Sequence, residues 1–513
     1  MAGISRRTLL HSAIGGGLSL SALPAYARPR QRKPLPQPII DVKRDFGAKG
    51  DGVSNDTEMF AAAGREIKKR GGGTVFIPTG VYVVGDQLKR DSVGMNTASD
   101  GRFWVHQPIL KIESCTKAVA IIGEGTDKTI LRARDGLRFG AFDPATGEVY
   151  AHDEPLLDVR YRADAYVGML EVRNNSSVRI SDIHLDGNAY KIMRGGTISD
   201  MPNDWQCMAY GIYAQGNHEV LISNVYTHDH GTDGVTIACN TGEAAKLHPH
   251  TLQHVRCDRN ARHGMSWIGQ SGLKAFDCSF SRSGQGAFKV RGGCGVDLEP
   301  DCDMSEGYFK RCMFEDNIGN GVSAEGKGSN KADLRDVTFD ACTFYATRTE
   351  INGSRINAIY VRRPGMTFRG CHITGVVNAG MLPATSLPHV FEDCDFVDAP
   401  SVPRDSSERM IDAAYGDAVI LKNCRFVAIM RAPLHLTGGT LECCRFDVRL
   451  SKDAKLQEWL ISISFSKVRN CVFIDNIVEP WEGPPKLGIV YTRELWKDNE
   501  IRSPKNRIVP SPG

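Results

Sequence analysis

The sequence lacks a long apolar run, an excess of one charge and any closely spaced pair of metal-binding cysteines. No stretch reaches the ~18 consecutive apolar residues of a membrane-spanning helix, so we expect no membrane span. Lysine and arginine total 63 against 60 aspartates and glutamates, and the net charge of +3 gives no sign of a nucleic-acid partner. Cys-x-x-Cys is absent, which disfavours zinc as the explanation of the 15 cysteines. With 41% hydrophobic residues, the 513-residue chain has the composition of a folded protein.

The N-terminus has the features of an export signal in their usual order. Arg6 and Arg7 precede a mildly apolar stretch over 14–23, and Ala25-Tyr26-Ala27 forms a small-x-small cleavage pattern. We therefore predict a twin-arginine signal peptide over residues 1–27, cleaved after Ala27, and a periplasmic or secreted protein. This route exports folded cargo, so the cysteines would fold in a reducing compartment and remain free thiols.

A repeat organises most of the remaining chain. Nine cysteines recur about every 27 residues, in the range of repeat architectures: Cys257, Cys278, Cys312, Cys342, Cys371, Cys394, Cys424, Cys444 and Cys471. Two residues after all but the first stands a large apolar residue: Phe280, Phe314, Phe344, Ile373, Phe396, Phe426, Phe446 and Phe473. This spacing places both side chains on one face of a strand, and a single such strand cannot bury itself.

The repeat therefore predicts an all-β solenoid, in which successive coils stack at ~4.8 Å and bury a common interior. The cysteines are expected to pack in that interior as small apolar residues. Residues 28–40, rich in proline and basic side chains, predict an extended linker. We assign the solenoid to 41–483 and a proline-rich tail to 484–513.

A second column of strands is marked by glycines at 211, 234, 264, 295 and 321. After each glycine, apolar and polar residues alternate, so the polar ones should face outward in one ribbon. The expected ribbon residues are Tyr213, Thr236, Ser266, Asp297 and Ser323, followed by Glu299 and Glu325.

Two further segments carry a family resemblance. Asp45-Phe46-Gly47-Ala48-Lys49-Gly50-Asp51-Gly52, a helical stretch to Lys69 and Gly71-Gly72-Gly73-Thr74-Val75-Phe76-Ile77-Pro78 follow one another. Together they strongly resemble the opening of the pectate-lyase-like superfamily, in its rhamnogalacturonase/epimerase-type branch. The resemblance implies a right-handed parallel β-helix with a short N-terminal capping helix, whose N-cap we place at Asp56 or Thr57. The superfamily includes hydrolases, lyases, epimerases and phage tailspikes acting on polysaccharides, so the fold alone does not choose the reaction.

The first candidate site is the pair Asp297 and Glu299, in a Gly-apolar-Asp-apolar-Glu-Pro run that related β-helix proteins also carry. Both carboxylates should face outward, about 6–7 Å apart along the strand. They could act as acid and base in glycoside cleavage, or bind calcium. A solvated strand face is the structural alternative.

The second candidate is the segment 227–234, which loosely resembles a polygalacturonase motif. Asp233 and His263 each directly precede a ribbon glycine, so neighbouring coils should bring them together as catalytic residues. His230 could neutralise a substrate carboxylate. The turn could also explain these residues, because Asp and His tolerate tight turns. The Asp-Asp pair, the Gly-His-Gly and the Arg-Ile-Lys of polygalacturonases are missing.

Basic and aromatic residues supply the remaining candidates. Residues 254–291 carry a local basic excess that suits an anionic polysaccharide. In related lyases an arginine or lysine removes the proton beside a uronate carboxylate, a role that Arg262, Lys289 or Arg291 could take here. Arg262 could alternatively bind substrate. Trp205, Trp267 and Tyr213 are expected to stack on sugar rings.

We expect an exported enzyme that cleaves a polysaccharide containing uronic acid, by hydrolysis in the first hypothesis. A lyase or C5-epimerase using a basic residue, and a solenoid that binds polysaccharide without catalysis, are the alternatives. No cofactor is required by the hydrolase hypothesis, and Ca²⁺ is expected only for a lyase.

Overall fold

The computed structural model confirms a right-handed parallel β-helix. It describes residues 34–89, 104–143, 146–149, 162–195, 207–240, 247–288, 290, 292–301, 303–324, 334–347, 350–351, 354–363, 365–379, 387–401, 408–413, 419–437, 439–449, 461–464, 467–475, 489–491, 496–502 and 509–510. Residues Pro36–Gly513 form one compact unit. The predicted signal peptide and most of the linker lie outside the described residues.

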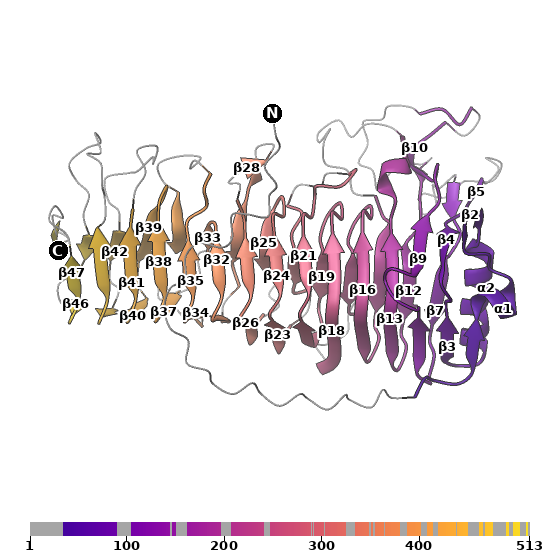
Figure 1. The fold of residues 1–513 in the computed structure, drawn as a ribbon, viewed down its shortest axis with the longest axis horizontal. Coiled ribbons are helices and arrows are strands. Elements are labelled where there is room, and N and C mark those ends of the chain that lie inside the picture. The colour runs from indigo at the N-terminus through magenta and orange to yellow at the C-terminus, as the bar shows by residue number, and fades with distance from the viewer. Residues whose placement is uncertain are drawn as a thin grey trace, which may run out of the picture. The chain divides into compact units, whose positions relative to one another are not determined.

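Two parallel sheets run the length of this unit (Figure 1). The 14-stranded sheet consists of β7 (Leu110–Glu113), β12 (Gly168–Arg173), β15 (Tyr210–Gln215), β17 (Val235–Ala238), β19 (Met265–Ile268), β22 (Val296–Glu299), β25 (Asn320–Ala324), β30 (Asn357–Val361), β33 (Val377–Asn378), β36 (Arg409–Ala413), β39 (Ala432–Thr437), β42 (Ile461–Ser464), β45 (Ile489–Tyr491) and β48 (Val509–Pro510). Each strand pairs in parallel with the strand of the next coil, so outward residues of successive coils form rows.

The 27-stranded sheet begins with β1 (Ile39–Asp41), β2 (Asp51–Asn55), β3 (Gly73–Phe76), β4 (Gly80–Val84), β8 (Val119–Ile122), β9 (Thr129–Ala133), β13 (Val178–Asp186), β16 (Val220–His228) and β18 (Leu247–Asp258). It continues as two rows. One holds β20 (Ser271–Phe276), β23 (Gly307–Lys310), β26 (Val337–Asp340), β31 (Met366–Arg369), β34 (His389–Glu392), β37 (Val419–Lys422), β40 (Thr440–Glu442), β43 (Lys467–Arg469) and β46 (Trp496–Lys497). The other holds β21 (Ser279–Ser281), β24 (Met313–Glu315), β27 (Thr343–Tyr345), β32 (His372–Thr374), β35 (Asp395–Val397), β38 (Arg425–Ala428), β41 (Arg445–Val448), β44 (Val472–Asp475) and β47 (Glu500–Arg502).

Several short elements lie outside the two long sheets. They are α1 (Val42–Phe46), the 3-10 turn η1 (Ala189–Lys191), the strand pairs β5 (Gln87–Lys89) with β6 (Trp104–His106) and β28 (Glu350–Ile351) with β29 (Ser354–Arg355), and the group β10 (Arg138–Ala141), β11 (Arg162–Ala163) and β14 (Met193–Gly195). Strands β45 to β48 continue both sheets beyond residue 483. No helix among the described residues is long and apolar enough to cross a membrane.

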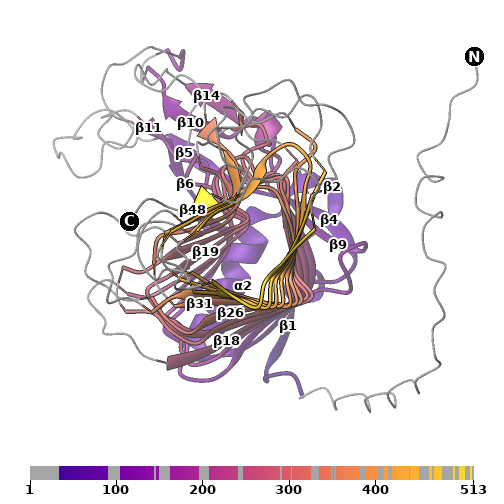
Figure 2. The same cartoon turned by 90° about the vertical axis from the view of Figure 1, so that its left-hand side faces the viewer.

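The helix α2 (Thr57–Lys69) lies across the first coils (Figure 2). It buries Phe60 and Ile67, and its backbone comes so close to β7 that a Cβ on Gly64 would meet the Lys111 carbonyl at 2.5 Å. This is the predicted capping helix, which shields the open end of the sheet. Asp56 is its N-cap residue, but the Asp56 carboxylate instead accepts from the Lys49 and Gly50 amides at 2.7 and 2.9 Å.

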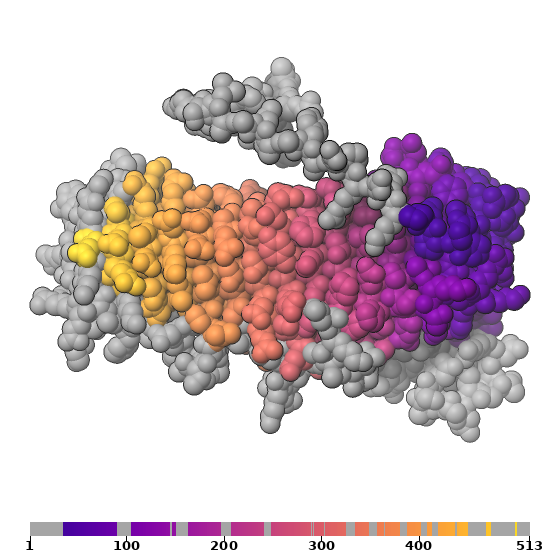
Figure 3. All heavy atoms as spheres, turned by 90° about the horizontal axis from the view of Figure 1, so that it is seen from below, coloured from indigo at the N-terminus to yellow at the C-terminus, as the bar shows by residue number. Residues whose placement is uncertain are grey.

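The cysteine and phenylalanine columns fill the interior, as predicted. Phe314 stacks on Phe344 at 4.6 Å and Phe396 on Phe426 at 4.5 Å, close to the spacing of paired strands. The cysteines of the described residues are free thiols, and the thiol of Cys312 donates to the Ala275 carbonyl at 3.6 Å. In Figure 3 the colours follow the chain along the long axis, because each coil stacks on the one before it.

A left-handed residue precedes many of these cysteines. Asp277, Asp393 and Asn423 each have φ of 55°. Asp and Asn adopt this conformation at the lowest strain among non-glycine residues, which explains their place in the repeat. The turn separates the two rows of the larger sheet and sends each cysteine inward.

Candidate active site

The predicted ribbon exists as one outward row of the 14-stranded sheet. Tyr213 pairs with Thr236, Thr236 with Ser266, Ser266 with Asp297 and Asp297 with Ser323 on successive coils. The alternation of apolar and polar residues was therefore assigned to the correct faces. Glu325 lies outside the described residues.

Asp297 and Glu299 face outward from β22, but they are closer together than the strand spacing suggested. Their side chains hydrogen-bond each other. Burial and the charge of Glu299 raise the pKa of Asp297 well above its usual range, which favours the protonated form of its carboxyl group. The expected 6–7 Å separation is too long for the carboxyl oxygens, because one oxygen of Asp297 and one of Glu299 lie within 4.8 Å of each other.

His263 holds this pair from the adjacent coil. Its Nδ1 accepts from the Cys294 amide at 3.0 Å, and its Nε2 lies 3.2 Å from Asp297 Oδ2. Burial and the nearby Arg262 lower the pKa of His263 to about 3, so the ring is neutral and its proton sits on Nε2. Neither nitrogen has a free lone pair for a substrate proton. His263 therefore orients Asp297 and cannot accept a proton from substrate, so the structure does not support the predicted catalytic role for it.

Asp233 is buried completely and binds Arg262 through two bonds. Arg262 Nε and Nη2 lie 2.8 and 2.7 Å from the two carboxylate oxygens, while Thr236 and Ser266 donate hydroxyls at 3.0 and 2.8 Å. Burial opposes ionisation, but Arg262 outweighs it and lowers the pKa of Asp233 to about 2. Asp233 therefore has no exposed surface for substrate, which contradicts a catalytic role at the reacting atoms.

Arg262 is partly exposed, with 19% of its side-chain area accessible. Burial acts against its charge, yet Asp233 raises the pKa of Arg262 above the ordinary arginine range. Arg262 cannot serve as the proton-removing base suggested from related lyases. It remains a fixed cation beside the carboxyl pair, as a substrate-binding residue requires.

Tyr210 is a site residue that the sequence reasoning missed. Its ring lies 5.0 Å from that of Tyr213, and it interacts electrostatically with Asp233, Arg262 and Glu299. Burial and the charge of Asp233 raise the pKa of Tyr210 above its usual range, so the phenol keeps its proton. Tyr210 directly precedes a ribbon glycine, as Asp233 and His263 do, and this shared position was the available signal.

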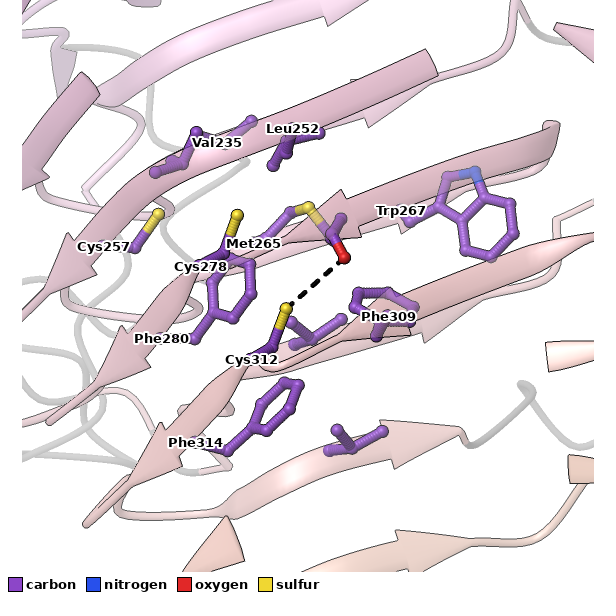
Figure 4. Packing of buried hydrophobic residues seen from close by; sticks show 14 of the residues in the cluster. Val235, Leu252, Cys257, Met265, Trp267, Cys278, Phe280, Phe309, Cys312 and Phe314 are labelled. Carbon is purple, nitrogen blue, oxygen red and sulfur yellow. Dashed lines mark hydrogen bonds between the residues drawn. The ribbon is translucent and has the colours of Figure 1, made fainter. Parts of the chain in front are cut away.

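Of the aromatic residues and the histidine that we expected to contact substrate, some are accessible in the structure and others are buried. Tyr213 is half-buried, with the Arg173 guanidinium 4.8 Å above its ring. Trp267 was expected to bind sugar but is completely buried, because it lies two residues after Met265 and shares the inward face (Figure 4). His230 is also fully buried and pairs with the Tyr166 hydroxyl at 3.0 Å, so it does not reach a substrate. Lys289, Arg291 and Trp205 lie outside the described residues.

The expected calcium has a partial fit here. Ligand atoms of His263, Asp297 and Glu299 lie within 4.8 Å of one another. When both are ionised, the two carboxyl groups offer the oxygen ligands that calcium prefers. The imidazole would face the ion with an N–H, so His263 stands outside the ligand set.

Comparison with known proteins shows the family. The family Rhamnogalacturonase A/epimerase, pectate lyase-like, matches residues 39–343. The chain belongs to this family. The resemblance of the N-terminal segments to this branch is thereby confirmed.

A short part of the chain is also similar in sequence to proteins named as alginate-modifying enzymes. It is 39% identical over 93 residues to alginate lyase 7 of Azotobacter vinelandii, covering 18% of this chain and 9% of that protein. A mannuronan C5-epimerase of the same bacterium is 39% identical over 93 residues, covering 18% of this chain and 5% of the epimerase. The chain thus matches only a small part of these relatives.

Solved structures align with most of this chain at TM-scores below 0.5. The A-module of an A. vinelandii mannuronan C-5 epimerase gives a TM-score of 0.48 at 16% identity, covering 92% of this chain and 99% of that one. A capsular polysaccharide depolymerase tailspike from Acinetobacter baumannii bacteriophage Fri1 gives 0.37 at 10% identity, covering 92% and 64%.

Proposed function

We propose that this protein is an exported enzyme that acts on a uronate-containing polysaccharide by β-elimination or C5-epimerisation. Both reactions begin by removing the proton beside the uronate carboxylate. The observation that carries the proposal is the hydrogen-bonded pair Asp297–Glu299 beside the fixed cation Arg262 and the protonated Tyr210. The named activities of the partial relatives, an alginate lyase and mannuronan C5-epimerases, support the same chemistry.

The carboxyl pair suits proton abstraction better than the hydrolysis first hypothesised. Glycoside hydrolases separate their two carboxyl groups by ~5–9 Å, so that a nucleophile or water fits between acid and base. Carboxyl oxygens of Asp297 and Glu299 instead lie within 4.8 Å of each other, and the two side chains hydrogen-bond. In such a pair, a carboxylate beside a second carboxyl group can accept the proton that is removed from one carbon.

In the proposed reaction, Arg262 and the Asp297 acid group face the substrate carboxylate and withdraw its charge. This acidifies the neighbouring C5–H bond. Glu299 removes the C5 proton as general base, while His263 keeps Asp297 in place. Tyr210, which burial keeps protonated, is the proposed proton donor.

The two outcomes differ only in where that donated proton goes. In β-elimination the C4–O bond breaks, a C4–C5 double bond forms and the leaving oxygen takes the Tyr210 proton. In epimerisation the C4–O bond stays intact and C5 regains a proton on its opposite face. Ca²⁺, when bound at the two carboxylates, would supply further positive charge for the anionic substrate.

The test uses the mature protein, with and without Ca²⁺, on alginate, on its mannuronate-rich and guluronate-rich fractions and on pectate. Unsaturated-uronate absorbance, new reducing ends and uronate epimer content by NMR are recorded together. Unsaturation with new ends identifies a lyase, and a changed epimer content without new ends identifies an epimerase. New ends without unsaturation contradict the proposal in favour of hydrolysis, and retained binding without products favours the binding solenoid.

A matched variant assigns the chemistry to the site. Asp412 lies in the same outward row as Asp297, several coils further along. Asp412→Asn should leave turnover unchanged while Glu299→Gln removes it. Export is tested separately: N-terminal sequencing of the exported protein should begin at Arg28.

A further inference from the structure

Uncharged side chains lie on the ribbon between Tyr213 and the Asp297–Glu299 pair. Over the two coils in between, the outward row holds Thr236 and Ser266, which are both buried. Their hydroxyls already donate to one buried carboxylate, at 3.0 and 2.8 Å. This part of the row offers no cation to an anionic polymer that lies along it, so recognition of further charges depends on the residues beyond it.

Arg173 stands at the far end of this stretch. Its outward row continues on successive coils through Gln215, Ala238, Ile268 and Glu299. From Glu299 toward the N-terminus, Arg173 is therefore the first charged side chain of that row. A polymer that extends from Glu299 in this direction meets its guanidinium.

The Arg173 guanidinium is fixed in place but not used up. Its Nε lies 2.5 Å from Glu171 Oε1, its Nη1 lies 2.6 Å from Gln215 Oε1, and the group lies 4.8 Å from the centre of the Tyr213 ring. Among the described residues, Nη2 has no hydrogen-bond partner, and 29% of the side-chain area is accessible. Arg173 is thus a positioned cation with free donors.

The charges around Arg173 do not cancel. Its partner Glu171 also lies 3.7 Å from Lys111 Nζ, and Lys111 and Lys68 approach Glu113 at 3.0 and 2.6 Å. Three cations and two carboxylates leave this group with a charge of +1. It can therefore attract a carboxylate that comes from outside the protein.

The groups of the proposed reaction lie on the same side of the carboxyl pair. Tyr210 belongs to β15, the strand that pairs with β12, and Arg262 lies just before β19. A polymer that contacts Glu299 and Tyr210 lies over β15 to β22, and Arg173 on β12 comes next. Four coil spacings, or ~19 Å, separate Arg173 from Glu299 along their row, so the two residues contact different sugars of one chain.

We propose that Arg173 binds the carboxylate of a second uronate on the same substrate chain, several sugars away from the reacting one. The inference rests on the proposed function and narrows its substrate class to a run of linked uronates. A guanidinium held by Glu171 and Gln215 presents its remaining N–H groups in a plane, which suits a carboxylate. Isolated uronates between neutral sugars do not supply this second contact.

The test measures how affinity depends on chain length. Glu299→Gln, which blocks turnover, is titrated by calorimetry with oligouronates from disaccharide to octasaccharide. Affinity should rise once the oligomer reaches Arg173, and adding Arg173→Gln should remove this rise and weaken the octasaccharide at least fivefold. Arg173→Lys should restore part of it. Arg362→Gln is the matched control, because Arg362 lies 5.0 Å from the Tyr360 ring, on the opposite side of Glu299, and should bind every length as before.

Equal affinities with and without Arg173→Gln at every length would overturn the inference. An equal loss in Arg362→Gln would also overturn it, because affinity would then reflect charge along the whole ribbon. Turnover by the parent with an unchanged length dependence would contradict only this inference, whereas neither turnover nor binding of any oligouronate would contradict the proposed function as well. If Arg173→Gln does not fold, carboxyl-reduced octasaccharide decides: its affinity should be lower than that of the acid form, and equal affinity would contradict the site.

Discussion

The coils that carry the candidate active site and the coils that follow them have the same parallel pairing but differ in the side chains that they bury. Between residues 207 and 299, full burial extends to polar groups such as Asp233, His230 and Ser266. Between 307 and 448, stacked phenylalanines and cysteines fill the interior, as in Phe309, Phe339 and Phe368.

The difference separates stability from chemistry along one axis. Backbone pairing repeats in every coil and does not depend on which side chains face outward. Apolar burial stabilises both regions, and in the site-bearing coils buried hydrogen bonds also fix Arg262 and Asp297. Substitutions should therefore affect activity in one region and folding in the other.

Glu299→Gln should have the largest effect on activity and almost none on stability. Removing the general base should lower kcat about 10³-fold, within the range of acid–base catalysis. Steady-state rates on the active substrate and a thermal melt measure both. A variant that retains most of its turnover would show that Glu299 is not the base.

Phe339→Ala should have the largest effect on stability in the aromatic coils. Phe339 is completely buried and stacks on Phe309 at 4.8 Å and Phe368 at 5.0 Å. Its truncation should lower the free energy of unfolding by about 3–5 kcal/mol, as measured in denaturant. Tyr345→Ala, at a 39% exposed side chain on β27, is the control and should change little. Equal losses in both would contradict the stacked interior.

The Asp233–Arg262 pair should make stability depend on acid pH. Asp233 has a pKa of about 2 in the folded chain, lower than the ~4 of an unfolded aspartate. Its contribution of about 2–3 kcal/mol is therefore complete above pH ~4 and is lost as the pH falls toward 2. Asp233→Asn should flatten the stability profile over that window. A profile as steep as that of the parent would show that other groups control the acid transition.

Tyr213→Ala should have the smallest effect of these. Loss of the half-buried ring should raise KM about fivefold, corresponding to ~1 kcal/mol of sugar stacking. Tyr360→Ala is matched, because Tyr360 lies in the same outward row with Arg362 at 5.0 Å from its ring. An equal rise in both variants would mean that the substrate extends along the row, and no rise in either would remove Tyr213 from the binding surface.

The fold could be predicted because its signals are periodic. Cys-x-Phe repeats and ribbon glycines report which face of each strand is buried, and the structure follows both columns. The same alternation places Trp267 on the inward face that it shares with Met265. The sequence therefore already argued against its proposed contact with sugar, and the structure shows that this proposal was wrong.

The site could be predicted only in part. Asp233, Arg262, His263, Asp297 and Glu299 do converge, because their coils stack in register. Their roles depend on which neighbour each hydrogen bond reaches, and spacing does not report this. The Asp233 carboxylate pairs with Arg262, while Nε2 of His263 faces the Asp297 carboxyl group.

The central claim is removal of the C5 proton, and NMR of the uronate polymer after reaction in D₂O tests it most directly. We predict either unsaturated ends, from β-elimination, or deuterium at inverted C5 positions, from epimerisation. Either product should form with the parent and with Asp412→Asn but not with Glu299→Gln. Shortened chains that keep every C5 proton and contain no double bond would contradict it and establish a hydrolase.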